Sequence, residues 1–276
     1  MKAVYLGPAG TFTHQAAKHM CPQMEYESAT SIEAVFEAVS LKKCIGVLPI
    51  ENSTEGAVNQ TLDGLLKWKL LITAGYVMPI KHVLMGKSYA INEIMAHPQA
   101  IAQCRRYLRK HYPEAILTSC ASNAAAAQLI GHGQAAIGPA EAAEEYGHQI
   151  LDRDIQNEDS NITMFIRLES ASTMALNTTH QSNQPHRSHQ AHPIIKNDMR
   201  TSIAFSTENK PGALYSMLGL FEKMGINMVK ILSRPIPKRP GEYVFFIDLE
   251  NCGEEVLERV KAKALEYWYF GSYSLL

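Results

Sequence analysis

The sequence lacks the long apolar segments that mark membrane-spanning or exported proteins. No uninterrupted apolar run approaches the roughly 20 residues that a helix needs to cross a bilayer. The first ten residues, MKAVYLGPAG, have the pattern of a strand that enters a glycine turn, which differs from the basic and then apolar pattern of a signal peptide. We therefore expect neither a membrane span nor a signal peptide, and a cytoplasmic location.

Paired cysteines and an excess of charge of one sign are also missing. The five cysteines include no Cys-x-x-Cys pair of the kind that holds zinc or does redox work: Cys21, Cys44, Cys104, Cys120 and Cys252. They predict free thiols in a reducing cytosol. The formal net charge of -1 argues against capture of nucleic acid or of an anionic membrane, because both favour a concentrated basic face. Small-molecule chemistry becomes the favoured class.

What is present describes an ordinary globular chain. Of the 276 residues, 46% are hydrophobic and 19% are charged, which allows a substantial core and is not typical of a disordered chain. Soluble domains usually have about 100–200 residues, so the length suits one large domain or two ordinary ones. We expect two domains.

Short β-like runs alternate with helical patterns through the first 170 residues, which predicts an open α/β sheet. The expected strands are residues 3–6, 45–49, 94–96, 116–118 and 135–138, with extended structure over 70–84 that Gly75 and Pro79 interrupt. The expected helices are residues 12–19, 31–41, 57–68, 98–111, 123–130 and 139–146. Two lobes of this kind leave a cleft between them, where ligands of such folds commonly bind.

Residues 171–198 are expected to form a polar linker, because their composition offers too little apolar surface to offset the entropy of ordering. Its histidines have no scaffold and no Cys or carboxylate partners, so we expect solvated side chains rather than a metal site: His180, His186, His189 and His192. The remaining residues read as strand 201–206, helix 212–224, strands 227–233 and 243–249, helix 254–265 and strand 267–273. This βαββαβ order predicts a ferredoxin-like domain, with Lys-Arg-Pro-Gly at 238–241 as the turn between its middle strands.

Two segments of the first domain combine glycine with polar residues before an expected helix. Residues 7–11, Gly-Pro-Ala-Gly-Thr, do not have the spacing of a Walker or dinucleotide-binding loop. Their backbone N–H groups, with the Thr11 and Thr13 hydroxyls, could receive a carboxylate, and a plain structural turn explains them equally well. In residues 49–56, Pro-Ile-Glu-Asn-Ser-Thr-Glu-Gly, helix capping by Ser53 or Thr54 leaves Glu51 and Asn52 unexplained.

Two further segments place polar side chains on apolar elements. In residues 97–104, His-Pro-Gln-Ala-Ile-Ala-Gln-Cys, Gln99 and Gln103 stand at i and i+4 and share one helical face. Two amides on one face could orient a polar ligand, although exposed glutamines often have this spacing by chance. In residues 161–165, Asn-Ile-Thr-Met-Phe, a hydroxyl stands in an apolar strand, where β propensity alone could place it.

Four segments, taken in order, resemble the prephenate dehydratases over the first 170 residues: GPAGTFT, PIENSTEG, HPQAIAQC and then NITMF after AAIGPAEAAEEYG. Residues after the expected linker resemble the ACT domain of the same enzymes through KPGAL at 210–214, SRP at 233–235 and GSY at 271–273. The resemblance implies a catalytic domain of two α/β lobes at residues 1–170 and a regulatory ACT domain at residues 199–276.

The resemblance implies that prephenate loses water and carbon dioxide to give phenylpyruvate, a step of phenylalanine biosynthesis. No cofactor or metal is expected, because expelling both groups creates an aromatic ring. The protein must hold two carboxylates, assist the leaving hydroxyl and exclude water. By motif match Thr163 would donate a hydrogen bond to the departing oxygen, since its hydroxyl is too weak an acid for full proton transfer. The other implied catalytic residues are Asn52, Gln103 and Glu51, and the implied substrate-binding residues are Gly10, Thr11, Ser53, Gln99 and Phe165.

The ACT resemblance implies phenylalanine as a feedback effector and assembly as a homodimer or homotetramer. The implied effector-binding residues are Gly212, Ala213, Leu214, Asn227, Ser233 and Arg234. Three positions depart from the family pattern: Met164 replaces an arginine, Ala96 a serine, and Leu232 an acidic residue. Two alternatives therefore stay open, a non-catalytic amino-acid sensor or binding protein with the same two-lobed fold, and an arogenate dehydratase with the same mechanism.

Overall fold

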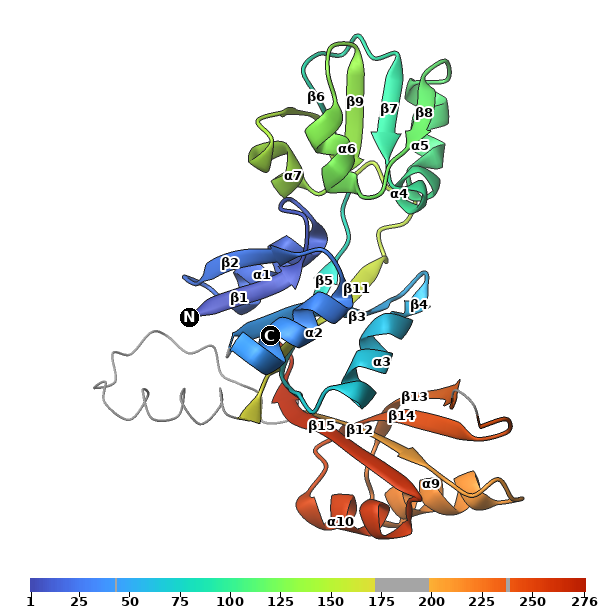
Figure 1. Cartoon of the computed structure of the whole chain (residues 1–276). Coiled ribbons are helices and arrows are strands. Elements are labelled where there is room, and N and C mark those ends of the chain that lie inside the picture. The colour runs from blue at the N-terminus through green and yellow to red at the C-terminus, as the bar shows by residue number, and fades with distance from the viewer. Residues whose placement is uncertain (43, 172–198, 237–238) are drawn as a thin grey trace. The chain divides into compact units, whose positions relative to one another are not determined.

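The computed structural model describes residues 1–42, 44–171, 199–236 and 239–276 (Figure 1). It contains two compact units. Unit 1 comprises Met1–Gly64 and Tyr76–Ile166, and unit 2 comprises Leu65–Gly75 and Arg167–Leu276. The short segment Leu65–Gly75 thus groups with the C-terminal residues. All but the first residue of the expected linker, its four histidines included, and Lys238 of the expected turn lie outside the described residues.

The first lobe of unit 1 is built on a sheet of order β2-β1-β3-β11-β5, to which β4 adds by pairing with β3. β1 runs parallel to both β2 and β3. The strands are β1 Lys2–Leu6, β2 Glu25–Ala29, β3 Ile45–Asn52, β4 Gly56–Ala57, β5 Leu71–Pro79 and β11 Ile162–Glu169, and the helices are α1 Phe12–Met20, α2 Ile32–Lys42 and α3 Asn59–Lys67. β5 and β11 each continue from one unit into the other.

The second lobe of unit 1 has a sheet of order β10-β6-β9-β7-β8 with helices on both faces (Figure 1). Its strands are β6 Val83–Gly86, β7 Glu93–Ala96, β8 Ile116–Ser119, β9 Gln134–Gly138 and β10 Gln149–Asp152. Its helices are α4 Pro98–Gln103, α5 Arg105–His111, α6 Asn123–Leu129 and α7 Ala140–Glu145. The two lobes confirm the α/β architecture that the alternating pattern predicts.

Strand alternation divides the core of the second lobe into two clusters. Leu84 and Ile137 pack on the side of α4 and α5, whereas Met85 and Ala136 pack on the side of α6 and α7. Successive side chains of a strand point to opposite faces, so a sheet with helices on both sides needs apolar residues at every position. This explains why β6 and β9 read as continuous apolar runs.

Unit 2 contains an antiparallel sheet of order β13-β14-β12-β15. Its elements follow the predicted βαββαβ order. They are β12 Met199–Ser206, α9 Ala213–Lys223, β13 Met228–Pro235, β14 Tyr243–Glu250, α10 Glu254–Lys263 and β15 Glu266–Ser274. Ile203 and Ile247 face each other on neighbouring strands, and with Phe221 and Val260 they form the core between sheet and helices. In β15 only glycine fits position 271, because its φ is +127° and a Cβ would collide with the Ile72 carbonyl oxygen.

Several element boundaries differ from the sequence prediction. The strands β2, β4 and β10 are not predicted; the edge strand β2 has charged and exposed residues, and β4 has only two residues. The helix expected from residue 57 begins at Asn59, because Gly56 and Ala57 pair with β3 instead. Gly75 does not interrupt β5, which runs on to Pro79.

The helix expected over residues 98–111 is divided at Cys104 into α4 and α5. Asn157 enters this break: its Nδ2 donates to the Ala102 carbonyl at 3.0 Å, and its Oδ1 accepts from the Arg106 N–H at 3.0 Å. In a continuous helix those two backbone groups would bond to each other. A side chain distant in sequence therefore breaks the helix, and the helical segment itself contains no Gly or internal Pro to signal it.

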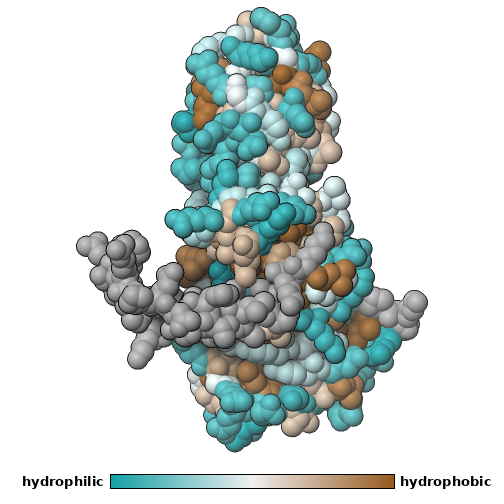
Figure 2. All heavy atoms as spheres, turned by 60° about the vertical axis from the view of Figure 1, so that its left-hand side comes forward, coloured by the Kyte–Doolittle hydropathy of each residue, from teal (hydrophilic) through white to brown (hydrophobic). Residues whose placement is uncertain are grey.

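The hydropathy of the surface and the state of the cysteines agree with what the composition predicts. The face of the second lobe seen in Figure 2 is mostly hydrophilic, with hydrophobic residues in small separate groups. No helix in the described part of the chain has the length and apolar character of a membrane span. All five cysteines are free thiols, as expected, and burial raises the pKa of the Cys104 thiol to about 12.

Candidate active site

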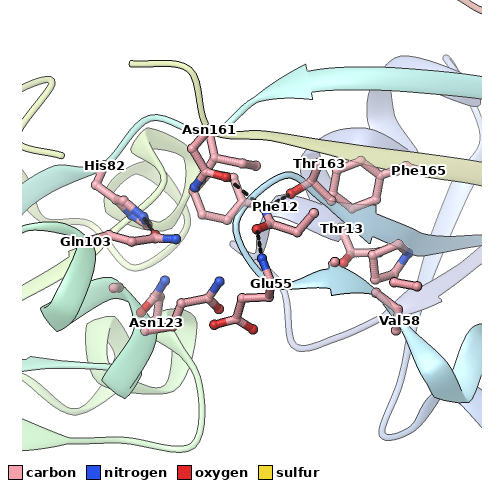
Figure 3. A pocket seen from close by; sticks show the side chains of 17 residues that line it. Phe12, Thr13, Glu55, Val58, His82, Gln103, Asn123, Asn161, Thr163 and Phe165 are labelled. Atoms are coloured by element: carbon pink, nitrogen blue, oxygen red, sulfur yellow. Dashed lines mark hydrogen bonds between the residues drawn. The ribbon is translucent and has the colours of Figure 1, made fainter. Parts of the chain in front are cut away.

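A cavity of about 360 Å³ in unit 1 is lined by residues of both lobes (Figure 3). Its volume falls within the roughly 300–1,000 Å³ of small-molecule sites. The lining residues are Phe12, Thr13, Pro49, Asn52, Glu55, Gly56, Ala57, Val58, Thr163 and Phe165 from the first lobe, Gln99, Ala100, Gln103 and Asn123 from the second, and Ile80, His82 and Asn161 from the connecting segments. The cleft expected between two lobes is therefore present.

The Asn52 side chain is held in one orientation at the end of β3. Its Oδ1 accepts the backbone N–H groups of Thr54 at 2.9 Å and Glu55 at 3.1 Å, which makes a local turn. Its Nδ2 donates to Thr163 Oγ1 at 2.8 Å and to Asn161 Oδ1 at 2.9 Å. Because the oxygen is engaged by two N–H groups, the amide nitrogen must face Thr163.

The Thr163 hydroxyl lies on β11 and lines the cavity, with only 8% of the residue exposed. Asn52 is the donor in their contact, so the Thr163 oxygen accepts and its hydrogen can be donated to another group. Phe165, two residues further along the strand, lines the same cavity because alternate residues share a face. The structure thus brings together Thr163, Asn52 and Phe165 as the resemblance implies.

Met164 stands between these two residues and lies on the opposite face of β11. It is 9% exposed and does not line the cavity. An arginine at this position would be directed away from the cavity, so the Met164 departure does not remove a cation from its wall. Ala96, the second departure, is buried at the end of β7, and its carbonyl oxygen accepts the Cys120 N–H at 2.8 Å.

In the turn at residues 7–11, the two residues expected to bind a ligand, Gly10 and Thr11, form hydrogen bonds with His14 of the same chain. The Gly10 N–H donates to His14 Nδ1 at 3.1 Å, and Thr11 Oγ1 accepts from the His14 N–H at 3.2 Å as the cap of α1. Neither Gly10 nor Thr11 lines the cavity; the following residues Phe12 and Thr13 do. A helix amino terminus carries a partial positive charge, so the start of α1 favours an anionic ligand.

The capping interpretation of Ser53 and Thr54 is wrong. Both hydroxyls donate to Asn161 Oδ1, at 3.3 Å and 3.2 Å, and Ser53 Oγ also accepts the Ile162 N–H at 3.0 Å. They fix β11 and Asn161 against the end of β3 instead of starting a helix. Neither Ser53 nor Glu51 lines the cavity, whereas Glu55 does.

Gln99 and Gln103 both line the cavity from α4, as their spacing predicts. Gln103 Oε1 lies 2.8 Å from Nε2 of His82, a residue that the sequence analysis does not single out. His82 is 2% exposed, and its ring meets Phe12 edge to face at 5.4 Å (Figure 3). Burial lowers the pKa of His82, and the hydrogen bond to Gln103 opposes part of that shift.

Most polar groups in the cavity wall are neutral amides and hydroxyls. Among the described residues that line it, Glu55 is the only acidic one and none is Lys or Arg. Within the same described ranges no three His, Cys, Asp or Glu side chains stand close enough to hold a metal ion. The wall is therefore suited to orienting a polar ligand through directed hydrogen bonds.

The residues implied for effector binding do not all meet in the described structure. Gly212 adopts a left-handed conformation with φ +79° at the start of α9, and the Ala213 N–H donates to the Lys210 carbonyl at 3.2 Å. Leu214 packs against the unit 2 core, and Asn227 Nδ2 donates to Glu250 at 2.7 Å. Ser233 and Arg234 are neighbours on β13, so their side chains point to opposite faces of the sheet.

Comparison with known proteins places these features in a family. The prephenate dehydratase family model matches residues 3–173, and the ACT domain model matches residues 201–263. A prephenate dehydratase of Methanocaldococcus jannaschii is 35% identical over 270 residues, covering 94% of this chain and 92% of that protein.

Two solved structures resemble the whole chain. Prephenate dehydratase of Arthrobacter aurescens in complex with L-Phe has a TM-score of 0.81 at 27% identity, covering 99% of this chain and 90% of that one. GqqA, described as a novel type of quorum-quenching acylase, has a TM-score of 0.83 at 22% identity and covers 100% and 98%, a likeness that shows the fold alone. The chain belongs to the prephenate dehydratase family and carries a C-terminal ACT domain.

Proposed function

We propose that the cavity of unit 1 converts prephenate into phenylpyruvate, with loss of water and carbon dioxide. The observation that carries the proposal is the Asn52–Thr163 contact, in which the amide occupies the acceptor side of the hydroxyl and leaves its hydrogen for a ligand. A hydroxyl held in this way is a preorganised hydrogen-bond donor, and one such donor can be worth about 10²–10³ in rate.

In this mechanism the ring carboxylate leaves as carbon dioxide, and its bonding electrons enter the ring while the bond to the hydroxyl breaks. Thr163 donates a hydrogen bond to the departing oxygen, which leaves as water once it takes up a proton from solvent. Phe12, Val58 and Phe165 form an apolar wall that keeps bulk water from the ring. Gln99, Gln103 and the start of α1 provide amide and backbone donors for the carboxylates.

Incubation of the purified chain with prephenate or with arogenate tests the reaction. Phenylpyruvate from prephenate is the expected product, and preferential formation of phenylalanine from arogenate would identify the related dehydratase instead. Thr163→Val is the matched control, because it keeps the shape of the side chain and removes the hydroxyl. Binding of both compounds without turnover would favour the alternative of a non-catalytic binding protein.

We also propose that residues 1–170 form the catalytic domain, residues 171–198 the linker and residues 199–276 the regulatory domain. The ranges that match the two family models support this division. Phenylalanine is the proposed effector of the ACT domain, since the Arthrobacter relative was solved with L-Phe. We propose a homodimer or homotetramer from the family resemblance, and light scattering with and without phenylalanine measures the assembly.

Calorimetric titration of phenylalanine beside the activity assay tests the regulatory proposal. Inhibition requires the effector to bind the active and inactive states with different affinity. We expect heat of binding together with a fall in rate, weakened by Leu232, which departs from the acidic residue of the family pattern. Absence of both at millimolar phenylalanine would refute regulation and leave the catalytic proposal standing.

A further inference from the structure

His82 and Gln103 form a pair in the wall of the cavity, joined by the 2.8 Å contact between Nε2 and Oε1 (Figure 3). Each member also has one buried nitrogen for which no hydrogen-bond partner stands among the described residues, Nδ1 of His82 and Nε2 of Gln103. Leaving buried polar atoms unsatisfied is costly, so such atoms in a pocket wall point to a ligand.

The backbone around the pair is anchored by the connecting segment between β10 and β11, residues 153–161. The His82 N–H donates to Gln156 Oε1 at 2.9 Å, and the His82 carbonyl accepts from the Ile155 N–H at 3.1 Å. The Asn157 N–H donates to the Gln103 carbonyl at 2.6 Å. The imidazole therefore has little freedom to move, and its position fixes what Gln103 can do.

The contact has a direction that follows from its atoms. Gln103 Oε1 can only accept, so His82 must carry its proton on Nε2 and donate it. The Gln103 amide nitrogen is then turned away from the imidazole, toward the interior of the cavity in Figure 3. Because burial lowers the pKa of His82, this single-proton tautomer is the form present near neutral pH.

We propose that His82 is a positioning residue, which holds Gln103 so that the two N–H bonds of its amide bind a carboxylate of the substrate. This inference rests on the proposed function and assigns the Gln103 contact to the side-chain carboxylate of prephenate, which the product retains. The opposite amide orientation would direct the Gln103 oxygen at the substrate and repel it. His82 thus acts through Gln103 and does not itself touch the reacting atoms.

Two amide substitutions of His82 test the proposal, because each places an N–H group where one of the two imidazole nitrogens stands. The amide nitrogen of His82→Gln takes the place of Nε2, which contacts Gln103, and that of His82→Asn takes the place of Nδ1, which does not. We expect His82→Asn to raise KM for prephenate about tenfold or more, because a hydrogen bond to a charged group is lost, with a smaller effect on kcat. His82→Gln should stay within about threefold of the parent KM. Equal damage in both variants would overturn the proposal.

A double-mutant cycle separates positioning from a purely structural role. If His82 acts only through Gln103, adding His82→Asn to Gln103→Ala should change KM by less than about twofold. Additive losses would give His82 an independent role and contradict the inference. Circular dichroism and urea unfolding of every variant verify that the fold is retained.

His148 supplies a matched control, because its Nε2 lies 2.6 Å from the Ala127 carbonyl oxygen and its buried Nδ1 also has no partner among the described residues. It does not line the cavity, so His148→Gln and His148→Asn should leave KM unchanged. Calorimetric Kd values for phenylpyruvate, which retains one carboxylate, read the same contact without turnover. If the parent protein does not turn over prephenate, the proposed function is wrong. The Kd values of the His82 variants for phenylpyruvate then still support or refute the positioning role.

Discussion

The hydroxyl of Thr163 is the group whose removal most directly tests the chemistry. Thr163→Ala removes a donor that acts on the departing oxygen, so we expect kcat to fall about 10²–10³-fold with a smaller change in KM. Thr163→Ser retains the hydroxyl and should recover part of the rate. Steady-state assays with prephenate measure both, and near-parental turnover of Thr163→Ala would show that the assigned role is wrong.

Thr61 is a suitable control for this series. It is fully buried, its hydroxyl donates to the Pro49 carbonyl at 2.7 Å, and it does not line the cavity. Thr61→Ala should lower the free energy of unfolding by about 1 kcal/mol and leave kcat close to the parental value. The comparison separates loss of a buried hydroxyl from loss of a catalytic one.

Buried histidines make stability depend on pH in a defined direction. Burial lowers the pKa of His82 and of His14 below the ordinary value of 6.5, so below about that pH the unfolded chain binds more protons than the folded one. Stability should therefore fall as the pH decreases from about 6.5 toward the lowered pKa values. Urea midpoints at about pH 7.5 and about pH 5.5 should differ less in His82→Gln than in the parent. An equal difference would contradict a neutral, buried His82.

The Met164 departure predicts a change in stability rather than in rate. Its side chain is buried on the face of β11 away from the cavity, so Met164→Arg would place a guanidinium where this chain buries an apolar side chain. We expect a loss of about 3 kcal/mol in the free energy of unfolding and no gain in kcat. Met164→Leu is the size-matched control. A higher kcat in Met164→Arg would restore a direct role for the missing guanidinium.

Sequence reasoning finds the site residues whose spacing or motif context is unusual. Capping leaves Asn52 unexplained, whereas chance and β propensity could account for Gln103 and Thr163, which are singled out by the motif resemblance. All three line the cavity. His82 gives no such signal, because it is a single histidine within the extended segment that is predicted over residues 70–84. Its significance depends on a contact with Gln103, 21 residues away, which no local pattern encodes.

At the scale of elements, the break between α4 and α5 links the connecting segment to the site. Asn157 replaces the helical bond between Ala102 and Arg106, and Gln103 lies at the end of α4. We expect Asn157→Ala to cost about 1 kcal/mol of stability and to raise KM, because Gln103 loses its fixed position. Urea unfolding and steady-state kinetics measure the two effects. An unchanged KM would show that the break does not position Gln103.

Elements with a strong apolar period are predictable from the sequence, and those defined by tertiary contacts are not. The interior strands β1, β3 and β9 have apolar runs that specify them. By contrast, β4 exists only because two residues pair with the end of β3 after the Asn52 turn. The same distinction explains why one predicted helix became two.

At the scale of the whole molecule, the proposed division into domains predicts where proteases cut first. Residues 171–198 have neither apolar periodicity nor the composition of a packed segment, so brief trypsin treatment should cleave after Arg187 or Lys196. Mass spectrometry should detect one stable fragment on each side of the cut. First cleavage within residues 3–165 would contradict the proposed division.

The turn that fixes Asn52 also protects it from slow loss of its amide nitrogen. That reaction requires the backbone nitrogen of the next residue to attack the side-chain carbonyl carbon of the asparagine. The Ser53 N–H instead donates to the Ile162 carbonyl at 2.9 Å, and both ends of the Asn52 amide are held by hydrogen bonds. An aspartate at this position could still accept the N–H groups of Thr54 and Glu55, but it could no longer donate to Thr163, whose hydroxyl would turn toward the new negative charge and away from the substrate.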